Sequence, residues 1–135
     1  MNEQEAIKAF LAGSPFAVVG VSPKRTKYGN KVLRAYLHDG RKVYAVHPIQ
    51  TEIEGQPCYR TLADLPEPVH GLSIITPPRI TEQIVDQAAE VGIGHLWMQP
   101  GAESDEAIRR AEQHGMNVIA GGPCLLVALR FFVED

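Results

Sequence analysis

The sequence predicts an α/β fold: a doubly wound parallel sheet of five strands with helices on both faces. Two observations lead to this prediction. Short apolar runs, such as FAVVGV at 16–21, alternate along the chain with amphipathic segments of helical period. These runs are continuously apolar, which is typical of strands covered on both faces, as in a parallel sheet. Because strands and helices alternate, the helices are expected to cover both faces of the sheet.

The five expected strands share an apolar run that ends at or near a glycine or a proline. They fall within residues 16–21, 42–48, 71–78, 95–101 and 117–122. Right-handed crossovers then favour the Rossmann-like strand order 3-2-1-4-5. Helices are expected at 2–11, over Val32–Leu37, Ile80–Val91 and Ala107–Ala111, and at 124–133, where an extended segment is the alternative. The segment 49–70 breaks the rhythm, so we expect a mostly irregular crossover with one or two helical turns. Thr61 to Asp64 has capping-box spacing before this short helix.

Composition limits what the chain can be. Its 135 residues, 44% hydrophobic and 21% charged, suit a single domain, which we expect to span 1–135. A net charge of −3 argues against nucleic acid as a partner. No apolar run approaches the length of a membrane span or a signal peptide, so neither a membrane nor secretion is expected. Cys58 and Cys124 form neither a disulfide framework nor a metal pattern, and a cytoplasmic location is the simplest expectation.

The loop after the first strand has the strongest functional pattern. It holds four cations within residues 24–31, in a chain that is acidic overall. It leads into a helix whose first N–H groups lack intrahelical partners and therefore form an anion site. Gly20 permits a tight turn at the strand end, and Gly29 permits close approach of a ligand. We interpret the loop as a phosphate site; the alternative is a solvated loop whose lysines aid solubility.

The pattern disfavours two common phosphate ligands. Gly20 and Gly29 are nine residues apart, so the G-x-G-x-x-G fingerprint of dinucleotide sites is absent. An NAD site also needs an acidic residue near the end of the second strand, where this sequence has Val46, His47 and Pro48. The G-x-x-x-x-G-K-[ST] loop of NTPases is absent as well.

Several motifs then resemble one family in the same order along the chain. They are VVGVS, YGNKVLRAYLHDGRKVYAVHP, IEGQPCYRTLADLPEPV, IITPP, WMQPGAESDEA and GMNVIAG. Together they resemble the small coenzyme A-binding proteins, which are related to the CoA-binding domain of succinyl-CoA synthetase and of NDP-forming acyl-CoA synthetases. Relatives often have Asp-Arg-Cys after the last strand, whereas this chain has Gly121 to Cys124.

The resemblance and the loop together define a set of expected cofactor-binding residues around the carboxyl ends of the strands. They are Gly20, Ser22, Pro23, Lys24, Arg25, Tyr28, Gly29, Asn30, His47, Pro48, Thr76, Pro77, Pro78 and Arg79. No catalytic or metal-binding residue is expected. Cys58 and Cys124 are interpreted as small buried residues, with a redox role towards the CoA thiol as the alternative.

The resemblance implies a module that binds coenzyme A or an acyl-CoA without catalysis of its own. The alternative is a subunit or relative of an acyl-CoA ligase, or a dinucleotide-dependent enzyme. The expected partner is a small nucleotide ligand. The apolar segment 124–133 leaves two hypotheses open, core packing or a subunit interface, so a homodimer and a partner enzyme subunit are both retained.

Overall fold

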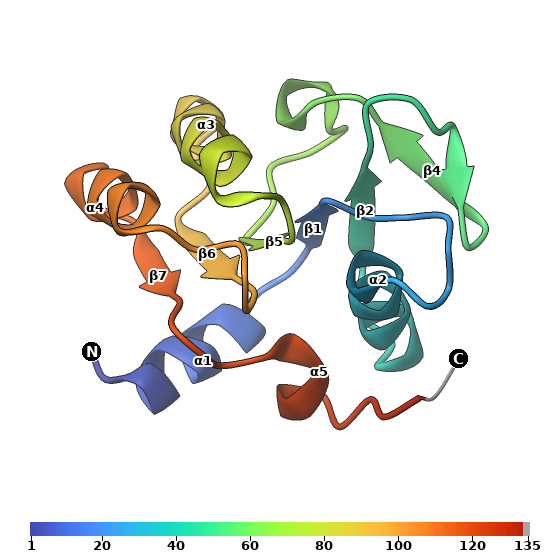
Figure 1. Cartoon of the computed structure of the whole chain (residues 1–135), viewed down its shortest axis with the longest axis horizontal. Coiled ribbons are helices and arrows are strands. Elements are labelled where there is room, and N and C mark those ends of the chain that lie inside the picture. The colour runs from blue at the N-terminus through green and yellow to red at the C-terminus, as the bar shows by residue number, and fades with distance from the viewer. Residues whose placement is uncertain (134–135) are drawn as a thin grey trace.

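The computed structural model describes residues 1–133 and confirms the α/β class (Figure 1). The strands are β1 (Phe16–Val19), β2 (Val43–Val46), β3 (Glu52–Ile53), β4 (Gln56–Tyr59), β5 (Gly71–Ile74), β6 (His95–Met98) and β7 (Asn117–Ile119). The helices are α1 (Glu3–Leu11), α2 (Tyr28–His38), α3 (Pro78–Glu90), α4 (Asp105–Gln113), α5 (Leu125–Ala128) and the 3₁₀ turn η1 (Leu62–Asp64). None of the helices in residues 1–133 has the length and apolarity to cross a bilayer.

The sheet has seven strands in the order β3-β4-β2-β1-β5-β6-β7, which corrects the expected count and order. The five expected strands lie in the order 2-1-3-4-5. The reason lies in the first part of the segment 49–70, where residues 52–59 form the antiparallel hairpin β3–β4 that was not expected. The expected order placed the third strand beside the second, which is β2. In the structure β4 pairs in parallel with β2 at that edge, so no other strand can pair there. Strand β5 therefore pairs with β1 on the other side, giving the second common doubly wound order.

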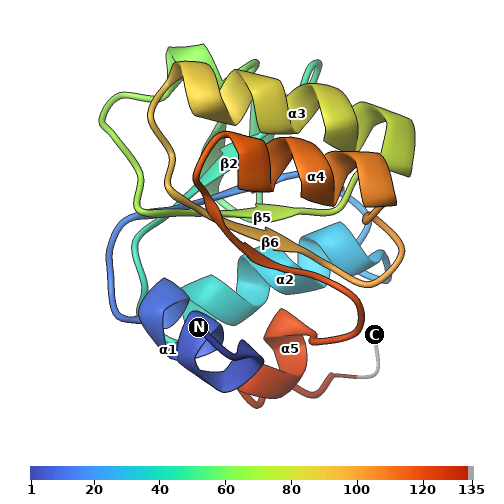
Figure 2. The same ribbon diagram turned by 90° about the vertical axis from the view of Figure 1, so that its left-hand side faces the viewer.

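The helices form two layers that enclose the sheet. Figure 2 shows α3 and α4 on one face and α1, α2 and α5 on the other. Strand β1 is buried along its whole length, and its side chains alternate between the two cores. Val19 packs into the core beneath α3 and α4, whereas Val18 packs with α2 and α5 on the opposite face. This double burial explains why the central strands are continuously apolar.

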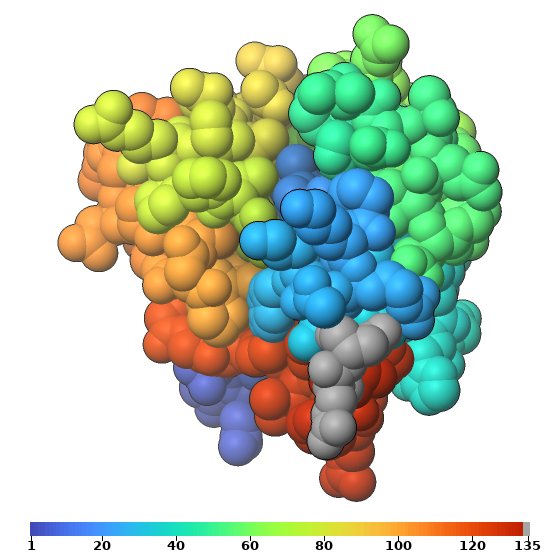
Figure 3. All heavy atoms as spheres, turned by 45° about the vertical axis from the view of Figure 1, so that its right-hand side comes forward, coloured from blue at the N-terminus to red at the C-terminus, as the bar shows by residue number. Residues whose placement is uncertain are grey.

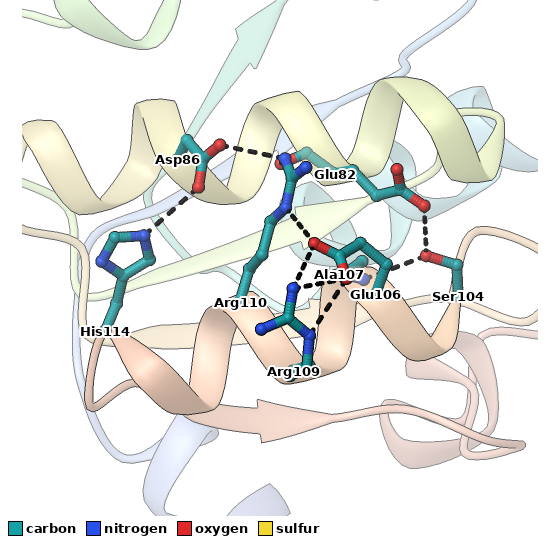
Figure 4. A network of polar contacts seen from close by, with 8 residues as sticks. All are labelled: Glu82, Asp86, Ser104, Glu106, Ala107, Arg109, Arg110 and His114. Carbon is teal, nitrogen blue, oxygen red and sulfur yellow. Dashed lines mark hydrogen bonds and ion pairs between the residues drawn. The ribbon is translucent and has the colours of Figure 1, made fainter.

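A polar network on the solvent side fixes α4 against α3 (Figure 4). Arg110 bonds through Nη1 to Asp86 Oδ2 at 3.0 Å and through Nε to Glu106 Oε2 at 2.6 Å. Arg109 and Arg110 hold the pKa of the Glu106 carboxyl below its usual value. The N-cap Ser104 donates from Oγ to Glu82 Oε2 at 2.7 Å. The start of α4 is thus held in place by contacts that lie outside the apolar core.

Two local expectations have different outcomes. The capping box at Thr61 is present: Asp64 Oδ2 accepts from Thr61 N, and the helical turn it begins is η1. The long closing helix at 124–133 is wrong, because α5 is confined to Leu125–Ala128. Arg130 adopts a φ of 54°, a left-handed conformation that does not continue a helix.

Candidate functional site

The carboxyl ends of β1, β2 and β5 meet at one edge of the sheet, where the strand order reverses. The chain passes from β1 to β2 on one side and returns at β5 to the other side of β1. In doubly wound sheets, ligands bind in the crevice at such a switch point. Figure 3 looks onto this region: the blue atoms that follow β1 lie between the yellow-green start of α3 and the green β3–β4 segment. The functional groups are therefore sought on the connections that follow these three strands.

Two glycines allow three backbone segments to pack closely at this edge. A Cβ on Gly29 would lie 2.1 Å from the carbonyl oxygen of Gly20, and a Cβ on Gly20 would lie 2.3 Å from the carbonyl oxygen of Ile75. Both distances are too short for any side chain. Gly20 also has a φ of 94°, which non-glycine residues rarely adopt. The start of α2 is therefore held directly against the ends of β1 and β5.

The first turn of α2 has the properties of an anion site. Its N-cap, Lys27, makes no side-chain capping bond, and the turn has no acidic residue. The preceding loop exposes three cations, Lys24, Arg25 and Lys27. Ser22 Oγ accepts a hydrogen bond from Lys24 N at 3.1 Å, which orders the beginning of the loop. Helix N-terminal N–H groups with cations beside them favour phosphate.

Asn30 holds the loop closed from inside. Its side chain is fully buried, and its Nδ2 donates to the carbonyl oxygen of Ser22 at 2.9 Å. Its Oδ1 accepts from Arg34 Nε at 2.7 Å, and Arg34 Nη2 donates to the carbonyl oxygen of Arg25 at 2.8 Å. Asn30 thus lies where it was expected, at the start of α2, but its bonds join parts of the loop to one another.

Glu54 is a member of this site that the sequence analysis missed. It lies in the turn of the β3–β4 hairpin, with a φ of 51°, and the next residue, Gly55, has a φ of 77°. Its Oε1 contacts Arg25 Nη1 at 2.5 Å, and its Oε2 accepts from Asn30 Nδ2 at 3.2 Å. Two residues of positive φ define the two-residue hairpin turn for which Asn-Gly or Asp-Gly is the usual signal. The Glu-Gly pair was the available signal in the sequence.

A pocket of about 420 Å³ adjoins the loop on the α3 side of the sheet. Four expected residues line it: Gly20, His47, Pro48 and Thr76. The others that line it were not expected and are mainly apolar: Val19, Val21, Val46, Arg60, Thr61, Leu62, Ile80, Ile84 and Gln87. An apolar cavity with a few polar groups at its edge is typical of a small-molecule site.

His47 lines this pocket, and one of its ring nitrogens is bonded to the backbone. Its Nδ1 accepts from the backbone N–H groups of Ile49 at 3.0 Å and Gln50 at 2.9 Å. An imidazole nitrogen that accepts is unprotonated, so the ring proton of neutral His47 lies on Nε2. His47 therefore caps the turn after β2 and keeps one N–H donor for a ligand.

The start of α3 holds the remaining expected residues. Pro77 is the N-cap and Pro78 the first residue of this helix. Together with Arg79 they are exposed and do not line the pocket. Thr76 Oγ1 contacts Thr81 Oγ1 at 2.7 Å, which fixes the turn between β5 and α3. The structure thus brings Thr76 to the pocket, while the following three residues lie at the surface beside it.

Tyr28 forms a second cluster on the opposite side of the sheet. Its hydroxyl lies 2.6 Å from Cys124 Sγ and 3.0 Å from Gln99 Oε1. Burial raises the pKa of this phenol above its usual value. Cys124, which the sequence placed in a glycine-rich turn, is half-buried and adjoins a separate cavity of about 380 Å³ with largely apolar walls.

The site has binding groups and no metal cluster. Within residues 1–133, no three His, Cys, Asp or Glu side chains are grouped so that they could hold a metal ion. The doubly wound sheet, the close-packed glycines, the uncapped start of α2 and the apolar pocket place the chain in the class of doubly wound α/β domains that have a crevice at the switch point. The chain belongs, within that class, to the CoA binding domain family, whose model matches residues 14–130.

The relatives include both ligases and a chain of similar length. The chain is 30% identical over 119 residues to acetate–CoA ligase [ADP-forming] I of Archaeoglobus fulgidus, a match that covers 81% of this chain and 17% of the ligase. It is 25% identical over 114 residues to the alpha subunit of acetate–CoA ligase [ADP-forming] II of Pyrococcus furiosus, covering 76% of this chain and 25% of that subunit. Its structure is similar to that of a conserved hypothetical protein from Pyrococcus furiosus, with a TM-score of 0.79 and 40% identity over 84% of this chain and 97% of the other.

Proposed function

We propose that this chain binds coenzyme A or an acyl-CoA at the switch point, with the phosphates at the loop 22–30 and the first turn of α2. The observation that carries the proposal is the uncapped start of α2, which is packed through Gly29 against Gly20 and has three exposed cations before it. Coenzyme A carries a pyrophosphate and a 3′-phosphate, so several cations favour it. The membership of the CoA binding domain family supports the choice of this nucleotide.

The pocket beside the loop suits the base of such a ligand. Its walls are mainly aliphatic, including Ile80 and Ile84 from α3 and Val46 from β2. Flat aromatic bases bind between apolar side chains, and a few polar groups fix their orientation. His47 Nε2–H and the guanidinium of Arg60 lie among the polar groups of this pocket and provide donors for a ligand phosphate or hydroxyl.

The proposed role is binding without a complete catalytic cycle. The chain spans 17% to 25% of the length of the curated ligases that it matches. An acyl-CoA ligase also needs a site for nucleotide and phosphate transfer, which we do not assign to this chain. A partner enzyme subunit that supplies this chemistry is the second candidate, and the match to a ligase alpha subunit favours it.

Isothermal titration with CoA, dephospho-CoA and NAD tests the proposed ligand. We expect CoA to bind and NAD to bind more weakly. The double variant Lys24→Ala/Lys27→Ala should weaken CoA binding by about tenfold or more, because two phosphate-facing charges are removed. Lys8→Ala, on the exposed side of α1, is the matched control. Absence of CoA binding at high micromolar concentration would contradict the proposal.

Native mass spectrometry of the protein as isolated tests which ligand it retains and whether it associates with another subunit. A retained mass corresponding to CoA or an acyl-CoA supports the binding role, and the same spectrum gives the oligomeric state. Co-purification with a subunit that binds ATP or ADP would favour the ligase-subunit candidate over an independent binding module.

A further inference from the structure

Glu54 places a carboxylate beside the start of α2, whose own first turn contains no acidic residue. The first turns of α1 and α4 each contain two acidic residues, whereas that of α2 contains none. A negative group near a helix N-terminus is stabilising. In this structure the negative group arrives from another element, because the carboxylate of Glu54 contacts both Arg25 in the loop and Asn30 in the first turn. A side-chain carboxylate therefore lies where the proposed function places an anion.

The contact joins the loop to a part of the sheet that has little support. Glu54 lies in the turn of the β3–β4 hairpin, and among residues 1–133 the edge strand β3 pairs only with β4. The Glu54 side chain is 18% exposed and that of Arg25 is 53% exposed. The Glu54 side chain is thus the more enclosed of the two partners.

We propose that Glu54 is an internal competitor for the phosphate site and thereby sets its affinity. The inference rests on the proposed function. When a phosphate arrives, the Arg25 guanidinium exchanges the carboxylate for the phosphate oxygens, which carry more charge and accept two parallel N–H bonds. The displaced carboxylate is then a like charge beside the ligand. Glu54 therefore weakens the binding of every anion that has to displace it from Arg25.

The alternative is that Glu54 only positions the loop. A permanent structural contact would keep Arg25 and Asn30 in the geometry that the ligand needs. Removing its charge would then weaken CoA binding. The two roles predict changes of opposite sign, so one substitution separates them.

The test is titration of CoA into the wild type, Glu54→Gln and Glu52→Gln at constant ionic strength. Glu52→Gln removes the same charge from the same hairpin at an exposed position and is the matched control. We expect Glu54→Gln to tighten CoA binding by about three- to tenfold, the scale of a partly exposed charge interaction, and Glu52→Gln to change it little. Thermal unfolding confirms that each variant is folded.

A double substitution tests whether the effect passes through Arg25. In the Arg25→Gln background, adding Glu54→Gln should tighten CoA binding by less than it does in the wild type, since the competed cation is gone. Unchanged or weaker binding by Glu54→Gln, while the wild type binds CoA, overturns the competitor role and leaves the proposed function standing. If neither the wild type nor any variant binds CoA, the proposed function fails and the competitor role falls with it.

Discussion

The Tyr28 hydroxyl lies 2.6 Å from the sulfur of Cys124, so the first residue of α2 contacts the N-cap of α5. Gln99 completes the cluster, because its Oε1 accepts from Tyr28 Oη at 3.0 Å and from Leu125 N at 2.9 Å. A phenol has one proton, and Tyr28 donates it to Gln99. The Cys124 thiol is therefore the donor in the short contact with Tyr28. The residues after β7 are thus bonded to the helix that begins at the proposed phosphate site.

Tyr28→Phe should release the Cys124 thiol. The substitution removes the acceptor of the S–H group and one donor to Gln99 Oε1, so we expect a loss of about 1 kcal/mol in the free energy of unfolding. Cys124 should also react faster with iodoacetamide. Urea denaturation measures the first effect, and mass spectrometry of the Cys124 peptide measures the second. The Cys58 peptide is the internal control, and equal alkylation rates at Cys124 in both proteins would contradict the bonding scheme.

Gln99→Leu should destabilise the fold although Leu has a similar size. Gln99 is fully buried, and the N–H of Leu125 loses its acceptor when the amide is removed. A buried donor without a partner costs about 1–3 kcal/mol, which is the loss expected in urea denaturation. Gln113→Leu, at the exposed end of α4, should change stability by less than about 0.5 kcal/mol. Equal stabilities of the two variants would show that the Gln99 bonds contribute little.

Gly29→Ala tests the close approach of α2 to the end of β1. Alanine normally favours a helix over glycine by about 1 kcal/mol. At this position its Cβ would lie 2.1 Å from the Gly20 carbonyl oxygen, so the backbone segments have to move apart. We expect a loss of about 1–3 kcal/mol in chemical denaturation and weaker CoA binding. Gly94→Ala is the control, since a Cβ there meets nothing within 4 Å, and an equally stable Gly29→Ala protein would contradict the packing.

The sequence was sufficient to predict the class of fold because the central strands are buried on both faces. The strand order was not predictable in the same way, since it depends on which strand pairs with β2. Strand β4 reads QPCY and contains Pro57, a residue that usually argues against a strand. Pro57 is tolerated because it lies near the sheet edge, where β4 pairs with the two-residue strand β3. Because β4 has no apolar run, the sequence contains no clear pattern that predicts its pairing with β2.

The loop of the candidate site was predictable from local sequence, and the groups that contact it were not. Four cations and two glycines after a buried strand are a local pattern. The contact of Glu54 with Arg25 joins residues 29 apart and depends on the hairpin that was missed. The contact of Tyr28 with Cys124 joins residues 96 apart and depends on where α5 begins and ends. Such contacts depend on the tertiary arrangement, and periodicity and composition do not predict which distant residues meet.

Protonation linked to His95 should lower the free energy of unfolding as the pH falls below about 6.5. Its ring lies 4.3 Å from the ring of His70, and its Nδ1 is buried without a partner among the described residues. Burial, followed by the charge of His70, lowers the pKa of His95 in the folded protein. The unfolded chain therefore takes up the proton at a higher pH than the folded protein does. The stability that neutral His95 provides is fully present above the unfolded pKa and is lost as the pH falls below it.

The measurement is the free energy of unfolding between pH 7.5 and 5, by urea denaturation, for the wild type, His95→Phe and His38→Gln. Phenylalanine keeps an aromatic ring beside His70 but takes up no proton. The free energy of unfolding of the His95→Phe variant should therefore fall less steeply with decreasing pH than that of the wild type. His38 is exposed on α2, and its substitution is the control for the loss of one imidazole. The comparison uses slopes because the larger ring also changes packing at every pH. Parallel curves for the wild type and His95→Phe would show that other groups cause the loss in acid.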